Sequence, residues 1–194
     1  MTVGSEAIKV AKPVVGGGVF VAPLGTELPT DYDTPLDSAF KPLGYVSEDG
    51  VTRTEENESE DKIAWGGDAV ADLPGNHTLS FSATFLEGRN AETLKALRGE
   101  ENVTVGSDGS ITVTSNSKRP PRAVYVIDTE SVREVIPNAQ IAVSGDIQYV
   151  HNEVIQYEAS WKAYPDASGN KAKQYFPADG EGDSGDEGDE SGEG

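Results

Sequence analysis

The chain has 194 residues, a formal net charge of -19 and no cysteine. The charge argues against binding to nucleic-acid phosphates or to anionic membrane surfaces, because both depend on Lys and Arg. The lack of cysteine excludes disulfides, a thiol nucleophile and a Cys-ligated zinc site.

The two ends of the chain set its expected domain organisation. The first residues, MTVGSEAIKVAKP, lack the basic and apolar regions of a signal peptide, and no apolar run approaches the ~20 residues that span a bilayer. Residues 178–194 contain eight acids, six glycines and no base or large apolar side chain, which predicts a disordered tail. We therefore expect a cytosol-made protein with one β domain and an N-terminal extension over 1–177.

The first elements in chain order are short strands. Residues 14–22, 40–47 and 50–54 have strand character, with Asp49-Gly50 as a turn. A loop rich in Pro and Asp separates the first two, over residues 23–37. Three consecutive glycines, 16–18, lack the lysine and the following helix of a phosphate-binding loop, so we interpret them as a bend or a close backbone approach.

The strongest strand pattern follows, where Leu79, Phe81, Ala83 and Phe85 alternate with polar residues. Residues 90–98 form the one predicted helix, because Asn90 is a good N-cap and Gly99 a good stop. Further strands are predicted at 103–105 and 111–114, joined by Asp108-Gly109 as a hairpin, and at 123–128, 131–138, 140–149 and 154–164. The pattern predicts a mainly β protein: an antiparallel β-sandwich or barrel with one flanking α-helix.

Candidate catalytic and metal-binding patterns are weak. The two histidines, His77 and His151, have no His or Cys neighbour in sequence. Acids in the tail match four positions of a calcium loop, but Ser184 stands where the turn requires glycine, and no helices flank it. Paired-carboxylate hydrolysis needs two acids across a cleft, and nothing in the sequence marks one. We assign no catalytic, metal-binding or cofactor-binding residue.

Two segments of opposite charge stand out instead. The acidic run, residues 55–61, contains Glu55, Glu56, Glu58, Glu60 and Asp61, and the sequence AWGG with Trp65 follows it. Adjacent acids on an extended chain point to opposite faces, so they do not converge on one ion. The basic segment, residues 118–122, contains Lys118, Arg119 and Arg122.

We interpret these charged segments as two halves of a subunit contact. Residues 52–70 would form an arm that projects from the body, with exposed carboxylates and Trp65 anchored against a neighbouring copy. The acids would face the basic segment of the next subunit, or would face water while Trp65 alone makes the contact. The alternative for both segments is a solvated loop. Trp161, within a predicted strand, is expected in the core or at an interface.

Four stretches of the sequence closely resemble the major tail protein, or tail tube protein, of phages with long non-contractile tails, above all those of actinobacterial hosts. They are GGVFVAPLGTELPTD, LDSAFKPLGYVSEDGV, SEDKIAWGGDAV and FSATFLEGRNAETLKALRGEENVTV. The resemblance covers residues 16–106 with specific motifs, and more loosely the strand-rich part to about 165.

The resemblance implies a fold of packed antiparallel sheets with one helix, and a structural, non-enzymatic role in the virion. Subunits of this family form hexameric rings that stack into a tube, which holds the tape-measure protein and then passes the genomic DNA. Tail terminator and tip proteins would bind its ends. The alternatives are a calcium- or carbohydrate-binding β-sandwich on a virion or cell surface, and a glycosidase using two carboxylates.

Overall fold

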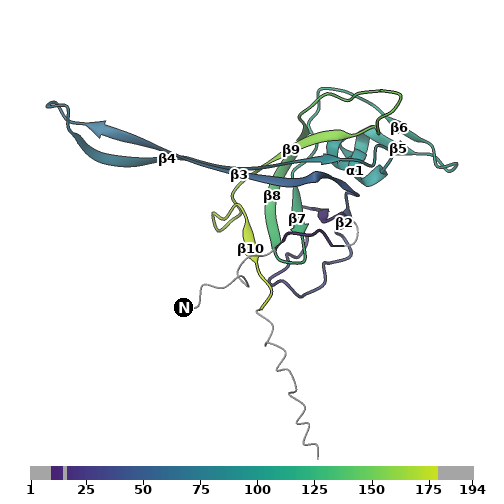
Figure 1. Cartoon of the computed structure of the whole chain (residues 1–194), viewed down its shortest axis with the longest axis horizontal. Coiled ribbons are helices and arrows are strands. Elements are labelled where there is room, and N and C mark those ends of the chain that lie inside the picture. Colours follow the sequence, from purple (N-terminus) through teal and green to yellow (C-terminus); the bar gives the residue numbers. More distant parts are fainter. Residues whose placement is uncertain (1–9, 15–16, 179–194) are drawn as a thin grey trace, which may run out of the picture.

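The computed structural model describes residues 10–14 and 17–178. These residues form ten strands and one α-helix, and the longest feature is a two-stranded hairpin that leaves the body (Figure 1). No helix in this part of the chain is both long and apolar enough to cross a membrane. The elements are β1 (Val19–Pro23), β2 (Lys41–Pro42), β3 (Val46–Ile63), β4 (Ala69–Phe85), α1 (Ala91–Arg98), β5 (Val103–Val105), β6 (Ile111–Val113), β7 (Ala123–Asp128), β8 (Arg133–Val143), β9 (Tyr157–Ala163) and β10 (Lys173–Tyr175).

One antiparallel sheet with the order β2-β1-β7-β8-β9-β4-β3 makes up most of the body, and β10 adds to β8. The sheet folds over, so that β3, β4 and β9 run across β7 and β8 in Figure 1. The main core lies between these two parts, with buried side chains from β1, β4, β7, β8, β9 and α1. The predicted fold class, an antiparallel β protein with one helix, is confirmed.

Trp161 lies at the centre of this core and is fully buried. Its indole ring stacks on Tyr125, Phe81 and Phe85, with ring centroids 5.9, 6.0 and 6.3 Å away. Phe81 and Trp161 are also direct partners in the β4–β9 ladder. Aromatic pairs at these separations add stability beyond their buried area, so this cluster fixes how β4 and β9 lie over β7.

The loop predicted at 23–37 covers the outer face of β1, β7 and β8. Its apolar side chains pack on Val124, Val126 and Val135 in a second core cluster. Arg133 holds the loop in place: the buried guanidinium pairs with Asp128 at 2.7 Å and donates to the Thr34 carbonyl at 2.6 Å. Because β7 is covered on both faces, its sequence AVYVID is almost continuously apolar.

The predicted helix is confirmed over Ala91–Arg98, since the side chain of Asn90 accepts hydrogen bonds from the backbone N–H groups of Glu92 and Thr93. Gly99, at φ 89°, ends the helix. The predicted hairpin is confirmed as β5 and β6. Gly17 makes the close backbone approach expected of the glycine run, because a Cβ there would lie only 1.9 Å from the Gly44 carbonyl oxygen.

Three boundaries differ from the prediction. The strands predicted at 131–138 and 140–149 are one strand, β8, which continues through Pro137 because one extra residue forms a bulge there. Residues 144–156 contain no strand, so β9 begins at Tyr157. Asp49-Gly50 is a bulge within β3 and not a turn between strands. The predicted disordered tail, 178–194, lies outside the described residues except for Ala178.

Removal of the two tryptophan side chains should change the stability of the monomer by very different amounts. Trp161→Ala should lower the free energy of unfolding by about 3–5 kcal/mol, because it empties the centre of the core. Trp65→Ala should change it by less than about 0.5 kcal/mol in the monomer, because Trp65 is 106% exposed. Urea unfolding of both variants at a concentration that keeps the protein monomeric measures the difference, and equal losses would contradict this assignment.

Candidate subunit interface

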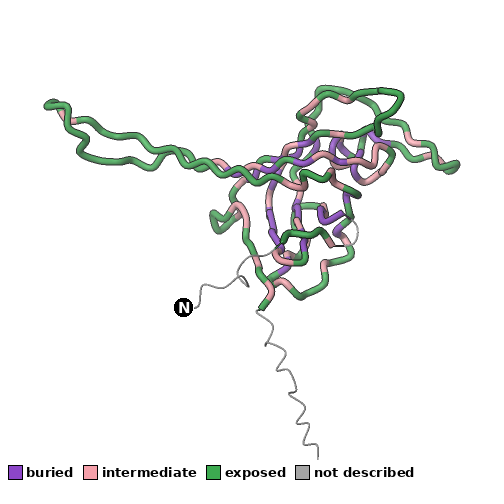
Figure 2. The backbone as a smooth tube through the Cα atoms, viewed as in Figure 1, coloured by how far each residue is buried: buried purple, intermediate pink, exposed green. Residues whose placement is uncertain are grey.

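The β3–β4 hairpin becomes a free-standing arm once it passes the body. Strand β9 pairs with β4 only over Ser80–Phe85, so residues 54–79, here called the arm, continue as a two-stranded ribbon. From Thr54 to His77 every residue except Ala64 is exposed (Figure 2). A two-stranded ribbon is at best marginally stable alone in water. The arm therefore depends on contacts at its root or on a partner along its length.

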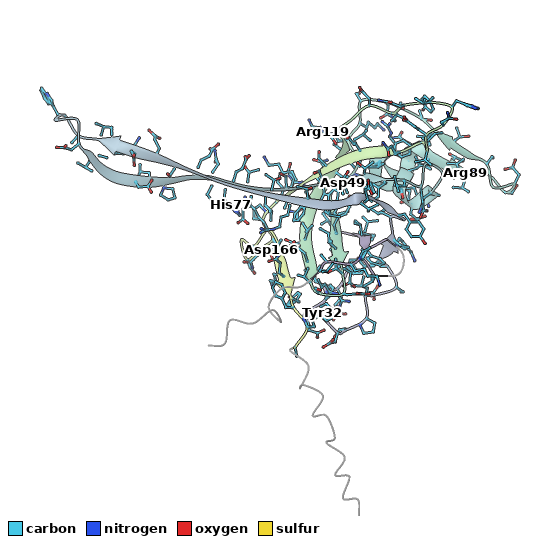
Figure 3. The ribbon with its side chains drawn as sticks, in the orientation of Figure 1. Tyr32, Asp49, His77, Arg89, Arg119 and Asp166 are labelled. Carbon is cyan, nitrogen blue, oxygen red and sulfur yellow. The ribbon has the colours of Figure 1, made fainter. Side chains whose placement is uncertain are left out.

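A chain of polar contacts, here called the root network, holds the arm to the body. The guanidinium of Arg53 bridges Glu134 of β8 at 3.0 Å and Glu55 of the arm at 2.7 Å. His77, labelled at the root of the arm in Figure 3, lies 2.9 Å from the second oxygen of Glu55. Gln174 donates to Glu134 at 3.2 Å, and Lys171 donates to the His77 carbonyl. The β3 side of the arm is thus tied to β8 through Arg53, and the β4 side is tied to the loop before β10 through Lys171.

The two carboxylates of this network have pKa values shifted in opposite directions. Hydrogen bonding to His77, and then the charge of Arg53, lower the pKa of Glu55. Burial raises the pKa of Glu134, and its contacts with Gln174 and Arg53 act against that rise. Glu134 is the buried carboxylate of the network and Glu55 is the exposed one. The guanidinium of Arg53 contacts both and compensates both negative charges.

The predicted acidic run lies entirely on β3 and does not form one cluster. Glu55, Glu56, Glu58, Glu60 and Asp61 spread over seven positions of an extended strand, whose side chains alternate between faces. Glu60 pairs with Lys62 at 2.8 Å and Glu58 accepts from Asn76 at 3.3 Å. Asp61 lies opposite Asp72, a repulsive pairing. In the described part of the chain, no three His, Cys, Asp or Glu residues are placed to hold a metal ion.

The tip of the arm is an apolar projection. A tight turn over Ala64–Asp68 closes it, with the Ala64 N–H donating to the Asp68 carbonyl at 2.8 Å and Gly67 at φ 90°. Trp65 stands on this turn without any cover from its own chain, and Ile63 and Val70 beside it are also more than half exposed. The projection of residues 52–70 as an arm with exposed acids is confirmed.

The basic segment lies on the body, away from the arm, as the label of Arg119 in Figure 3 shows. Lys118 pairs with Glu101 at 3.3 Å, and the guanidinium of Arg122 lies 3.7 Å from the centre of the Tyr164 ring. The structure of one chain therefore does not bring the acidic run and the basic segment together. A contact between them requires two copies and stays a prediction.

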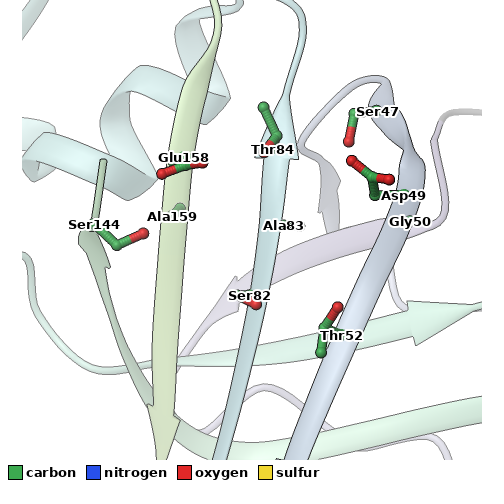
Figure 4. A pocket seen from close by; sticks show the side chains of 10 residues that line it. All are labelled: Ser47, Asp49, Gly50, Thr52, Ser82, Ala83, Thr84, Ser144, Glu158 and Ala159. Atoms are coloured by element: carbon green, nitrogen blue, oxygen red, sulfur yellow. The ribbon is translucent and has the colours of Figure 1, made fainter. Parts of the chain in front are cut away.

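A shallow polar pocket of about 280 Å³ lies where the β3 bulge faces β4 and β9 (Figure 4). Hydroxyls of Ser47, Thr52 and Ser82 line it, and its two carboxylates come from Asp49 on β3 and Glu158 on β9, with β4 between them. This volume lies below the 300–1,000 Å³ of typical small-molecule sites. The pocket is a by-product of the bulge, because four residues of β3 there span a single residue of β4.

A family model described as "Phage tail tube protein" matches residues 1–180. The chain belongs to this family. The resemblance to a tail tube protein is thereby confirmed, and the protein is a structural component of a phage tail tube in the virion. No curated protein matches the chain.

Three solved structures match the chain at low sequence identity and at TM-scores below 0.5. The tube-terminating cap of the anti-feeding prophage is 8% identical at a TM-score of 0.42, covering 91% of this chain and all of the cap chain. A chain of the PVC sheath-tube complex, from an extracellular contractile injection system in its extended state, is 10% identical to this chain at a TM-score of 0.41. The match covers 91% of this chain and 99% of that one. A chain of the six-fold symmetrised baseplate of the anti-feeding prophage is 14% identical at a TM-score of 0.37. The match covers 86% of this chain and 98% of that one.

The root network of the tail tube protein was not found from the sequence. Its members lie far apart along the chain, so only the folded sheet brings Arg53 to Glu134. The one available signal was local: Arg53 and Glu55 are two residues apart, on the same face of a strand.

Loss of the root network should loosen the arm. Arg53→Met leaves Glu134 buried without its cation, and we expect a loss of about 1–3 kcal/mol together with faster amide exchange over 55–78. The matched control is Lys62→Met, which removes an ion pair between two exposed side chains and should change stability by less than about 0.5 kcal/mol. Hydrogen-exchange mass spectrometry compares them, and equal exchange of the arm in both variants would refute the role of Arg53.

The lowered pKa of Glu55 makes its contact with His77 sensitive to acid. A carboxyl whose folded pKa is depressed stabilises the fold above its unfolded pKa, and that contribution is lost as the pH falls through the folded value. The loss should therefore lie below the ordinary Glu pKa of 4.5. Carboxyl NMR titration should give a lower pKa for Glu55 in the wild type than in His77→Ala, and identical values would contradict the assignment.

Proposed function

We propose that the protein forms stacked, six-membered rings of a long non-contractile tail tube, in which the arm of each subunit joins it to a neighbour. The observation that carries this proposal is the fully exposed Trp65 at the tip of a ribbon that its own body does not cover. Aromatic side chains that become buried at the centre of an interface contribute most of its binding energy. A tube subunit supplies the repeated partner that such a tip requires.

The arrangement of the arm favours a contact that repeats. The arm projects from one side of the body, whereas the helix and the basic segment lie elsewhere on it, so arm and acceptor are different surfaces (Figures 1 and 3). A contact between two different surfaces is heterologous, and it closes into a ring or continues along a filament. Stacked rings need one contact that closes each ring and another that continues along the tube axis, and the arm supports either one.

The charge of the chain suits a conduit for DNA. A net charge of -19 gives a surface that repels phosphates, so DNA would pass through the lumen without sequence-specific binding. The tape-measure protein would fill the lumen before ejection, and terminator and tip proteins would bind the tube ends. The role is structural, without catalysis: the pocket with two carboxylates in Figure 4 is small and arises from the β3 bulge.

Electron microscopy of the purified protein over a range of concentrations tests this function. Rings or tubes with six-fold symmetry support the proposal, as does recovery of the protein from purified virion tails. A protein that stays monomeric at high concentration and is absent from virions would falsify it. Binding of calcium, detected by calorimetry and a raised melting temperature, would favour the alternative of a calcium-binding module.

Removal of the Trp65 indole should impair assembly more than folding. We expect Trp65→Ala to weaken each arm contact by at least about 2 kcal/mol, as for other aromatic interface centres. Tyr149→Ala is the matched control, because Tyr149 is also exposed but lies on the body outside the arm. Analytical ultracentrifugation and negative-stain microscopy measure the assembled fraction. If Trp65→Ala assembles as the wild type does, Trp65 is not the anchor.

A further inference from the structure

An apolar groove lies between α1 and β1, bordered by the end of the basic segment. Its volume is about 570 Å³, within the range that holds an aromatic side chain with its neighbours. Leu24 at its edge is half exposed, and Tyr125 of the main core reaches its base. The other apolar lining residues are Val21, Ala22, Pro23, Ala39, Ala96, Pro121 and Ala123.

Cations surround this apolar floor. Lys41, Lys95 and Arg122 line the groove, together with the carboxylates of Glu92 and Glu100. Lys95 neutralises Glu92, since their charged atoms are 2.8 Å apart. The guanidinium of Arg122 lies over the Tyr164 ring and is exposed to solvent, and Lys118 and Arg119 precede it along the chain. The groove thus adjoins the basic segment of an otherwise acidic protein.

The arm tip complements the groove in shape and charge. Trp65, with Ile63 and Val70 beside it, forms the apolar centre, and Asp61, Asp68 and Asp72 flank it. Burial of an indole removes roughly 150–250 Å² from water. Flanking carboxylates opposite lysine and arginine would orient the contact and speed its formation.

The tip cannot reach the groove of its own chain. In Figure 1 the arm extends to one side of the body, while α1 and β2 lie toward the other. The eleven residues from Thr54 to Ala64 make ten steps along a β-strand, so they extend the arm by ~33 Å. That reach is close to the ~35–40 Å width of a compact body of this size. A second copy placed beside the arm can therefore present its groove to the tip.

The geometry points to a specific joint: Trp65 of one subunit docks in the groove between α1 and β1 of the next, with its flanking aspartates against the basic segment. This inference rests on the proposed function and adds the acceptor surface to it. A second apolar groove among the described residues, of about 420 Å³, is a poorer acceptor because Glu48 and Glu134 line it together with the single cation Arg53. The flanking aspartates would meet like charge there.

Cross-linking between two single-cysteine proteins tests the joint directly, because the chain has no cysteine of its own. Gly66→Cys places a thiol on the tip and keeps Trp65, and Leu24→Cys places one at the groove. Mixed and treated with a short bismaleimide, the two should give a covalent heterodimer. The matched control mixes Gly66→Cys with Phe176→Cys, an exposed position elsewhere on the body, and should give little product.

A charge reversal gives a second, independent readout. Arg122→Glu should raise the concentration needed for tube formation at least about tenfold, and Asp68→Arg in the same chain should restore much of the loss, because it rebuilds the opposite-charge pair. Leu24→Asp should act like Arg122→Glu, whereas Leu24→Met should assemble normally. Far-UV circular dichroism of each variant establishes that it is folded.

The outcomes separate this joint from the broader function. Selective cross-linking of the tip to the groove supports the joint. Tubes in the microscope with equal cross-linking in both mixtures, or with none in either, overturn the groove as acceptor and leave the tube function intact. A wild-type protein that forms no assembly overturns both.

Discussion

The stacking of Trp161 against Phe81, Phe85 and Tyr125 is the packing on which the rest of the molecule depends. It fixes β4 and β9 over β7, and β4 is the strand that leaves the body as one side of the arm. Leu79, at the root of the arm, is buried in this core. The direction of the arm is therefore set by the core, because the same strand contributes to both.

The arm is a structure that a single chain leaves incomplete. Within the described residues, each strand of the arm pairs its backbone with the other strand on one side and has no strand on its outer side. The apolar tip also has no cover there. The root network holds it at one end through Arg53, which joins a buried and an exposed carboxylate. Such an element gains most from association, since a neighbour can cover the tip and neutralise the acids that repel one another along the ribbon.

The two tryptophans show how position in a strand decides the role of the same side chain. Trp161 alternates with polar residues in a strand whose neighbours are apolar, and it fills the core. Trp65 stands between glycines and acids on a tight turn, where no neighbouring strand can cover it. This difference supports a structural role for one indole and an intermolecular role for the other. It also explains why a subunit can keep its stability and lose its assembly.

The sequence by itself determined the fold class, the helix at Ala91–Arg98, the β5–β6 hairpin and the apolar face of β4, because these follow from local capping, turn chemistry and alternation. It also marked residues 52–70 as exposed, since six acids and two glycines leave little there to bury. Only the tertiary structure decided that β8 continues through Pro137, that β3 continues through Asp49-Gly50, and that Arg53 meets Glu134. The groove beside α1 is likewise tertiary, because Val21 and Tyr125, which both line it, are 104 positions apart in the chain. Bulges, long-range ion pairs and grooves depend on how strands align across the sheet, and alignment is not encoded in any one stretch of the chain.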